Sequence, residues 1–285
     1  MSPSLSYEIF PPRTATGRAT LAASLVELRR IPPALVSVTY GAGGSDTDRS
    51  FEAVRLASEL AEAPVAAHLT CVGVPRHQVA TVIDTYLELG VRHIVALRGD
   101  PTEGIDAPYT PHPEGFTSTA ELVAAIRAQG AAVGVDFTVS VSAYPEVHPQ
   151  SRDLTHDLDV LAAKVDAGAD RAMTQMFFDN GTLRRYRDAV AERGIEIPIV
   201  PGIMPIHAID RVVDFARRCG AGVPDALLAH FDGITSNHPD HRRRAIEWTV
   251  AQIAELRHDG FDEFHLYTLN QSDLVLEIVD ALEQP

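Results

Sequence analysis

The sequence repeats one pattern eight times: a short apolar segment ends in polar or glycine residues, and a loop and a segment of helical periodicity follow. The apolar segments are rich in Val, Ile and Ala and alternate little with polar residues, which is typical of parallel strands covered on both faces. The predicted strands are Ser6–Phe10, Leu35–Tyr40, Val65–Cys71, His93–Gly99, Thr138–Tyr144, Arg171–Phe177, Ile197–Ile203 and Glu263–Leu269. Eight such units in the length of one barrel domain predict an α/β fold, a (β/α)8 TIM barrel, with an open doubly wound sheet as the alternative.

Amphipathic segments between these strands predict helices, and several end at a glycine, as helix ends commonly do. The helices are expected at Ser50–Leu60, Gln78–Leu89, Ala120–Ala128, Leu154–Ala167, Leu183–Ala191, Ala208–Arg218, Val223–Phe231 and Arg242–Leu256, and the helix-ending glycines are Gly90, Gly130, Gly168, Gly194 and Gly220. Pro101–Gly115 contains four prolines and two glycines, so we expect a long irregular loop over the mouth of the barrel. No linker interrupts the chain, and residues 1–285 are expected to form a single domain.

The composition limits the partners of the protein. A net charge of −15 argues against a nucleic-acid partner and against an anionic membrane surface, so an anionic ligand would need a local basic patch. No segment has the length of a membrane span, and no secretion signal is recognised. The two cysteines, Cys71 and Cys219, suit a reducing compartment. We expect a cytoplasmic protein that binds small molecules.

Two strand ends carry charged residues that could take part in catalysis, because barrel chemistry takes place where the strands end. Glu8 lies inside the first strand. If it points into the mouth, burial raises its pKa and makes it a candidate general acid; otherwise it is a surface or salt-bridged residue. Arg98 and Asp100 flank Gly99, which lets the backbone approach a ligand, although the two charges could equally form a surface ion pair.

Three further polar residues are candidates for ligand contacts. Tyr144 and His148 lie on a loop flanked by prolines, which would suit contacts with phosphate or ribose or would form a structural corner. Gln175 is an amide among apolar strand residues, and its partner is either a ligand heterocycle or the core.

Metal and classical dinucleotide sites are not indicated. His68 and Cys71 are three positions apart on a strand, which places them on opposite faces, and no ligand motif accompanies them. Gly41–Gly44 could approach a phosphate, but the chain has neither a dinucleotide-binding glycine fingerprint nor a P-loop. We expect no metal.

The ordered set of strand ends resembles the methylenetetrahydrofolate reductase family. The motifs that carry the resemblance are Tyr7–Arg13, Ser37–Ala42, His68–Cys71, Leu97–Asp100, Ala143–Glu146, Lys164–Ala169, Thr174–Gln175 with Phe177–Phe178, Pro201–Ile203, and Phe264–His265 with Tyr267–Asn270. Each motif alone is weak, but the ordered set spans nearly the whole chain and is specific.

The resemblance implies reduction of 5,10-methylenetetrahydrofolate to 5-methyltetrahydrofolate on a (β/α)8 barrel. It implies that Glu8 is the general acid that helps open the imidazolidine ring to a 5-iminium ion, and that Asp100 stabilises positive charge beside the pterin. It places Gln175, Phe215 and Tyr267 at the folate. We expect Glu8 to be protonated through a raised pKa and Asp100 to be ionised.

The family pattern also contains contacts to FAD, and this chain retains only some of them. Matches occur at Thr39, His68, Arg98, Gly99, Asp100, Tyr144, His148, Asp157 and Lys164. Ser118 stands in place of a Tyr, Val160 in place of an Asn and Ala163 in place of an Arg. Loss of an Arg beside a diphosphate removes bidentate hydrogen bonds. The chain therefore resembles the flavin-independent, actinobacterial-type branch, in which NADH would transfer hydride directly.

The contacts expected for the glutamate tail of folate differ as well. Arg211 stands in place of a Gln and Gln271 in place of an Arg, and Arg211 could replace the lost cation. No arginine cluster is evident for a 2′-phosphate, which favours NADH over NADPH. Two alternatives are the same reaction through bound FAD and a non-catalytic folate- or nucleotide-binding barrel.

Overall fold

The computed structural model describes residues 3–40, 47–101 and 109–283. The strands within them form one sheet in the order β7-β6-β5-β4-β3-β2-β1-β9-β8, and every pairing is parallel. The strands are β1 (Ser4–Ile9), β2 (Leu35–Val38), β3 (Val65–Thr70), β4 (His93–Leu97), β5 (Thr138–Ala143), β6 (Arg171–Thr174), β7 (Ile199–Val200), β8 (Gly202–Ile203) and β9 (Glu263–Tyr267).

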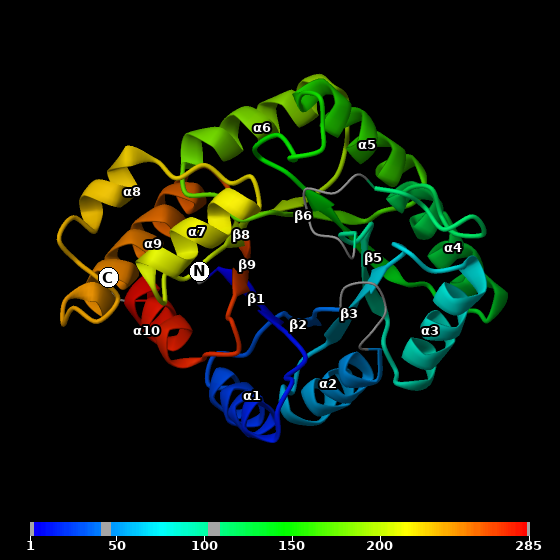
Figure 1. Ribbon diagram of the computed structural model, residues 1–285, viewed down its shortest axis with the longest axis horizontal. Coiled ribbons are helices and arrows are strands. Elements are labelled where there is room, and N and C mark those ends of the chain that lie inside the picture. The colour runs from blue at the N-terminus through cyan, green and yellow to red at the C-terminus, as the bar shows by residue number, and fades with distance from the viewer. Residues whose placement is uncertain (1–2, 41–46, 102–108, 284–285) are drawn as a thin grey trace.

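The sheet curves round into a barrel (Figure 1). Pro201 separates β7, which pairs with β6, from β8, which pairs with β9. Proline has no amide hydrogen, so it divides one strand position into two segments. The predicted (β/α)8 barrel is therefore confirmed, and the doubly wound sheet is excluded.

Helices surround the sheet (Figure 1). They are α1 (Ala15–Leu28), α2 (Thr47–Leu60), α3 (Arg76–Glu88), α4 (Thr119–Ala132), α5 (Leu154–Asp166), α6 (Asn180–Glu192), α7 (Ile209–Arg218), α8 (Asp225–His230), α9 (His241–His258) and α10 (Asp273–Leu282). The helices α1 and α10 were not predicted, and α7, α8 and α9 all lie between β8 and β9. No helix in the described part of the chain is long and apolar enough to cross a bilayer.

Most of the predicted helix-ending glycines have the left-handed backbone, namely Gly90, Gly168, Gly194 and Gly220. The prediction for Gly130 is wrong, because α4 continues to Ala132 and Gly134 follows with φ +71°. A Cβ on Gly130 would lie 2.5 Å from the carbonyl oxygen of Val135 and 2.8 Å from the ring of Phe137. Glycine at this position therefore permits close packing.

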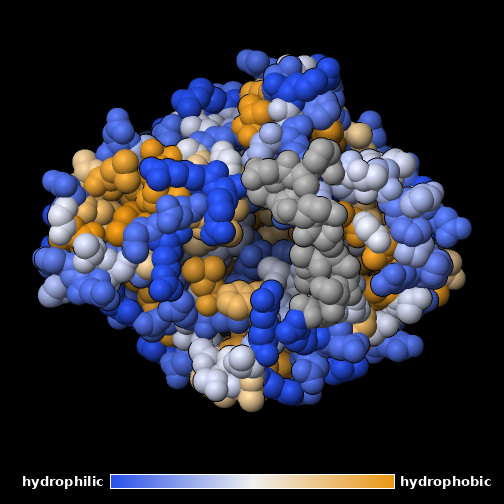
Figure 2. All heavy atoms as spheres, in the orientation of Figure 1, coloured by the Kyte–Doolittle hydropathy of each residue, from blue (hydrophilic) through white to orange (hydrophobic). Residues whose placement is uncertain are grey.

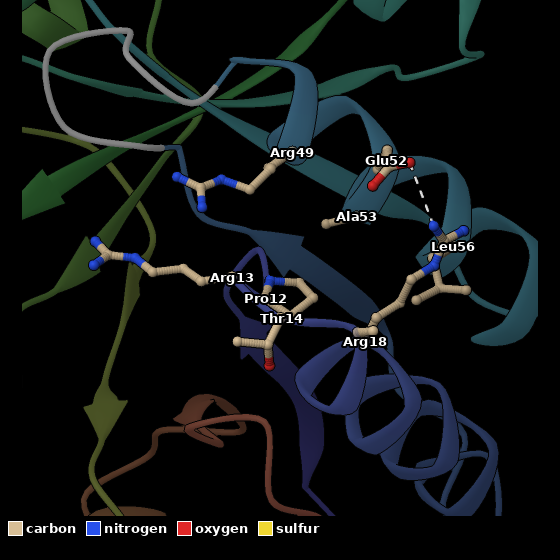
Figure 3. Close-up of a pocket in the computed structure, with 9 residues that line it drawn as sticks. Pro12, Arg13, Thr14, Arg18, Arg49, Glu52, Ala53 and Leu56 are labelled. Carbon is tan, nitrogen blue, oxygen red and sulfur yellow. Dashed lines mark hydrogen bonds and ion pairs between the residues drawn. The ribbon is translucent and has the colours of Figure 1, made fainter.

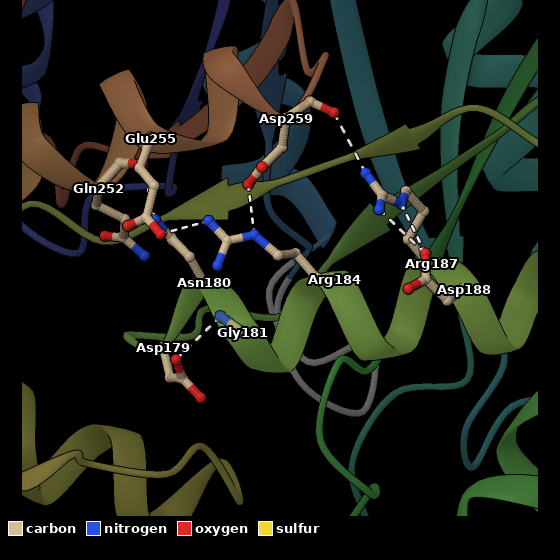
Figure 4. Close-up of polar contacts among 9 residues, drawn as sticks. All are labelled: Asp179, Asn180, Gly181, Arg184, Arg187, Asp188, Gln252, Glu255 and Asp259. Carbon is tan, nitrogen blue, oxygen red and sulfur yellow. Dashed lines mark hydrogen bonds and ion pairs between the residues drawn. The ribbon is translucent and has the colours of Figure 1, made fainter.

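Polar contacts join α6 to α9 on the outside of the barrel (Figure 4). Arg184 binds the carboxylates of Glu255 and, at 2.6 Å, of Asp259. Asn180 donates to Glu255 at 2.8 Å, and Gln252 belongs to the same group of side chains. These contacts join α6 to α9 and to the residue that follows α9.

The interior of the barrel is polar beneath its mouth. Six buried residues there are Ser6, Ser37, His68, His93, Ser140 and His265. Barrel interiors are usually filled by branched apolar side chains. Some apolar residues of these strands, such as Tyr7 and Ile9, pack in the large core clusters, whereas Leu35, Ala66 and Val95 form a small cluster with Met173 and Val200. The sequence therefore places ionisable groups directly under the ends of β1, β3 and β9.

Candidate active site

A cavity of about 700 Å³ opens where the strands end, a volume typical of small-molecule sites. Figure 2 shows a hollow near the centre of this view. Thirteen predicted site residues line the cavity: Glu8, Thr39, His68, Arg98, Gly99, Asp100, Tyr144, His148, Asp157, Lys164, Gln175, Phe215 and Tyr267. The fold therefore brings these residues, which are distributed along the whole chain, to one cavity.

Arg211 and Gln271 do not border this cavity. Arg211 is exposed on α7, where its spacing to Phe215 and Arg218 places the three side chains on one helix face. Phe215 and Arg218 do line the cavity, so Arg211 lies farther along the same face. Gln271 is exposed after β9, and its backbone amide donates to the carbonyl of Thr268 at 2.9 Å. Their predicted contacts with substrate stay predictions.

Glu8 points into the barrel and meets two histidines from distant strands. Its Oε2 lies 3.6 Å from Nε2 of His68 and 3.7 Å from Nε2 of His265, and its side chain is 22% exposed. Ser37 Oγ lies 3.2 Å from Nε2 of His68 and 3.3 Å from Nε2 of His265. Ser6 Oγ lies 2.7 Å from Nδ1 of His265. A buried polar network therefore runs from the cavity into the barrel.

The histidines change the protonation of Glu8. Burial raises the pKa of Glu8, but the interaction with His265 and the electrostatic effects of His68 and His265 together outweigh burial, so the net pKa lies below the ordinary value. Burial lowers the pKa of His68 to about 4, although Glu8 opposes that shift. His68 is therefore uncharged at neutral pH, and Glu8, whose pKa is lowered, is ionised there. The predicted raised pKa of Glu8 is wrong for the open cavity.

The turn after β9 holds the end of β1 in place. Thr268 Oγ1 donates to the carbonyl of Glu8 at 2.6 Å. The Asn270 side chain accepts from the amide of Phe10 at 2.9 Å and donates to its carbonyl at 2.8 Å. Leu269 and Asn270 have φ of +51° and +58°, a conformation that costs free energy for residues other than glycine. The turn thus fixes the direction of the Glu8 side chain.

Neither His265 nor Asn270 was assigned a role from the sequence. Side chains alternate along a strand, so His265 lies on the same face of β9 as Tyr267, which was expected at the folate. The strand pairing puts His265 opposite Ser6 and Tyr267 opposite Glu8. Alternation could therefore have placed His265 inside the barrel, whereas the contacts of Asn270 with Phe10 have no sequence signal.

The end of β4 brings its backbone close to β3. Gly99 has φ +85°, and a Cβ there would lie 2.6 Å from Cγ1 of Val72 and 2.9 Å from Cβ of Thr70. The Arg98 guanidinium lies 4.8 Å from the centre of the Tyr109 ring. In the part of the chain that the structure describes, no ion pair joins Arg98 to Asp100. Asp100 is exposed at the rim of the cavity.

The side of the cavity next to α5 has its polar groups bonded within the protein. Lys164 donates from Nζ to the carbonyl of Ser142 at 2.8 Å. Burial lowers the pKa of Lys164 to about 8, with Asp157 opposing the shift. Asp157 accepts from the amide of His148 at 2.8 Å and from the hydroxyl of Ser151. Both residues therefore have partners without any ligand.

The three departures from the flavin pattern have separate structural explanations. Val160 presents an apolar side chain, 40% exposed, to the cavity. Ser118 accepts from the amide of Glu121 at 3.2 Å and caps α4. Ala163 is exposed on α5 and does not border the cavity.

Two residues on the far wall are held by the backbone. Tyr267 donates to the carbonyl of Thr174 at 2.7 Å. The side-chain oxygen of Gln175 accepts from the amide of Met176 at 2.9 Å. Gln175 thus borders the cavity with a fixed orientation, as expected for an amide that reads a heterocycle.

The metal interpretation gains no structural support. His68 lines the cavity, whereas Cys71 lies in the apolar cluster outside the barrel. Across the described ranges, no group of three His, Cys, Asp or Glu side chains could hold a metal ion. Gly41–Gly44 lies outside the described residues.

Comparison with known proteins agrees with this geometry. The family model described as methylenetetrahydrofolate reductase matches residues 1–283. The chain belongs to the methylenetetrahydrofolate reductase family. It is 37% identical over 279 residues to 5,10-methylenetetrahydrofolate reductase of Pectobacterium carotovorum, covering 98% of this chain and 89% of that protein. It is 31% identical over 283 residues to methylenetetrahydrofolate reductase (NADH) 1 of Zea mays, covering 96% of this chain and 47% of that one.

A solved structure is similar in fold alone. It is an uncharacterised Clostridium thermocellum protein that binds two copies of 5-methyl-5,6,7,8-tetrahydrofolic acid. The TM-score is 0.63 at 13% identity, over 99% of this chain and 94% of that one. The family assignment identifies the present protein as an oxidoreductase; the fold similarity adds the barrel architecture.

Proposed function

We propose that this protein reduces 5,10-methylenetetrahydrofolate to 5-methyltetrahydrofolate by direct hydride transfer from NADH. The reaction consumes one proton and one hydride. The proton allows the imidazolidine ring to open to a 5-iminium cation, and the hydride from NADH then adds to the iminium carbon and leaves NAD⁺. The relative from Zea mays, whose name specifies NADH, supports this nicotinamide over NADPH.

The observation that carries the proposal is the position of Glu8. Its carboxyl lies at the bottom of the cavity, within 4 Å of His68 and His265, and its backbone is held by Thr268. Such a group can deliver the proton and then stabilise the cation that forms. Asp100 at the rim adds a second negative charge.

The lowered pKa of Glu8 requires that it gain its proton on substrate binding. The folate ring, when it covers the mouth of the cavity, would remove water from the Glu8 carboxylate. This further burial raises the pKa of Glu8. The histidines lie close enough to exchange a proton with Glu8 once the contacts shorten. We therefore infer that Glu8 is ionised in the open cavity and protonated under the bound folate.

The absence of a resident flavin is the second part of the proposal. Lys164 donates to Ser142 and Asp157 accepts from the amide of His148, so the protein itself already uses part of the hydrogen-bonding capacity of both residues. Val160 offers no hydrogen bond to the cavity. The residues of this side do not fit FAD, and direct transfer needs none.

The FAD-dependent reaction remains the second candidate, because Arg98, Tyr144 and His148 line the cavity as that reaction would require. The visible spectrum of freshly purified protein separates the two. Direct transfer predicts no flavin absorbance, no stimulation by added FAD, and intersecting double-reciprocal plots from a complex of both substrates. Stoichiometric flavin with parallel plots would establish the FAD route, and absence of turnover with or without FAD would leave a binding protein.

A further inference from the structure

Glu146 lies between two residues of the catalytic cavity but does not itself border the cavity. Tyr144 and His148 both line it, and their rings meet edge to face with centres 4.5 Å apart. The half-buried side chain of Glu146 instead reaches the segment that follows α7, where it accepts from the backbone amide of Gly222 at 2.6 Å. This hydrogen bond joins two segments that are 76 positions apart in the chain.

The packing around this hydrogen bond is close enough to require glycine at two positions. A Cβ on Gly222 would overlap the Glu146 carboxylate, and a Cβ on Gly220 would lie 2.7 Å from Cγ of Pro149. Gly220 also has φ +75°, the left-handed conformation in which helices commonly end. The loop after β5 and the end of α7 are therefore in direct contact beside the cavity.

The end of α7 forms part of the cavity wall. Phe215, Arg218 and Cys219 line the cavity there. The opposite face of α7 packs on the core through its buried apolar residues. Because apolar packing has no preferred direction, it does not by itself fix the helix end relative to the loop after β5. The hydrogen bond to Gly222 has a defined length and direction, and it supplies that link.

Exposed ion pairs elsewhere on the surface are a weaker kind of link. Arg18 on α1 and Glu52 on α2 form such a pair beside the small hollow drawn in Figure 3, at 3.3 Å and with both side chains more than half exposed. Pairs of this kind contribute little to stability. Glu146 binds a backbone amide instead, so its hydrogen bond holds the chain itself and not a long flexible side chain.

We infer that Glu146 is a positioning residue, which sets the separation between the loop after β5 and the end of α7 and thereby places Phe215 against the folate ring. The inference rests on the proposed function, because it requires a folate ring to bind beside Phe215. Glu146 touches neither reactant and acts through Gly222. A misplacement of about 1 Å can cost about 100-fold in rate, so the position of this wall matters for catalysis.

Loss of Glu146 should affect the two reactants differently. The loop after β5 keeps a second tether, because Asp157 accepts from the amide of His148 at 2.8 Å. Tyr144 and His148, which we assign to the nucleotide, therefore stay in place. The end of α7 loses its hydrogen bond to the loop, and Phe215 moves with it. Binding of the folate should weaken more than binding of NADH.

The test compares Glu146→Ala with Glu146→Gln in steady-state turnover and in titration calorimetry with 5-methyltetrahydrofolate and with NADH. Gln keeps a side-chain oxygen that can accept from the Gly222 amide. For Glu146→Ala we expect the KM and Kd for the folate to rise about fivefold, kcat to fall about fivefold, and the Kd for NADH to change less than about twofold. Glu146→Gln should restore most of the native values.

Gly222→Ala disturbs the same hydrogen bond from its other end. Gly222 does not have the left-handed backbone, so the effect of the added Cβ is to displace the Glu146 carboxylate. This variant should also raise the KM for the folate. In the Glu146→Ala background it should add little, because the overlapping atoms are then absent. Additive losses in the double variant would contradict the inference.

Asp170→Ala is the matched control. Asp170 precedes β6 and accepts from the amide of Val139 at 2.6 Å, near the ends of the strands that lie opposite the cavity. Its loss should lower stability without changing the KM for the folate. A native KM in Glu146→Ala, equal losses for folate and NADH, a Glu146→Gln enzyme as impaired as Glu146→Ala, or the same KM change in Asp170→Ala would overturn the inference. If the native protein neither binds nor reduces the folate, the proposed function fails instead.

Discussion

The two sides of the catalytic cavity hold their polar groups in different ways. On the β1–β9 side, Glu8 approaches His68 and His265 at 3.6 and 3.7 Å, longer than ordinary hydrogen bonds. On the α5 side, Lys164 and Asp157 make contacts of 2.8 Å with the backbone. Long contacts of this kind can shorten when a substrate binds.

This difference shows why the family-matching residues on the β1–β9 side and those on the α5 side need not have the same function. The groups beside Glu8 can still gain or lose a proton and change partners. Those on α5 already bond to the backbone, and their removal would leave those backbone groups of the protein unpaired. We therefore expect substitutions on the β1–β9 side to change chemistry and those on the α5 side to change mainly stability.

The largest effect is expected for Glu8→Gln. The amide keeps the size of the side chain but cannot supply the proton, so kcat should fall about 10³-fold while folate binding persists. Lys164→Met provides the comparison on the other side, and its kcat should change less than about threefold. Rapid-mixing measurements of NADH oxidation would show both. A Glu8→Gln enzyme with a nearly native rate would exclude Glu8 as the acid.

The polar interior should also make the protein sensitive to acid. Burial lowers the pKa of His68 and of His93 to about 4, from an ordinary 6.5. The unfolded chain therefore binds protons below pH 6.5 that the folded chain rejects, so stability falls between pH 6.5 and 4 and levels off below that range. Each histidine contributes about 3 kcal/mol to this loss. Denaturant titrations should show that the free energy of unfolding falls less between pH 6.5 and 4 in His93→Asn than in the native protein. An identical pH dependence would contradict the lowered pKa of His93.

The barrel could be predicted because its information is local: each strand is a short apolar run with a polar end. The failures have particular causes. In α1 the buried face includes Ser24 beside Leu21 and Leu25, which weakens the apolar pattern. Almost every residue from Leu274 to Val279 in α10 is buried, so a helical period is hard to recognise.

The candidate active site also has features that local sequence predicts and features that it does not. Thirteen of the residues predicted from strand ends and from the family pattern line one cavity, whereas Arg211 and Gln271 do not border it. The direction of the Glu8 pKa shift could not be predicted from the sequence. It depends on His68 and His265, which are 60 and 257 positions away in the chain. Only the barrel brings these two side chains to Glu8, so the protonation of Glu8 depends on the fold.

An intermediate effect is expected for Asn270→Gly. Glycine adopts the left-handed backbone without strain but removes both hydrogen bonds to Phe10. The end of β1 should become less ordered, and kcat should fall about tenfold with little change in the KM for NADH. Ser24→Ala, which removes only the hydroxyl bonded to the Asn270 carbonyl, is the control for general loosening. Equal decreases of kcat in both variants would indicate that Asn270 stabilises the structure without positioning Glu8.

The smallest and most diagnostic effect is expected for His265→Asn. The interaction with His265 lowers the pKa of Glu8, so its removal should raise that pKa. Because the acid form is the active one, activity declines as pH rises through the pKa of Glu8. The variant should therefore retain activity to higher pH. Profiles of kcat/KM for the folate would show the shift. The reverse shift would mean that burial, rather than the histidine, controls Glu8, and the contrast between the two sides of the cavity would lose its electrostatic basis.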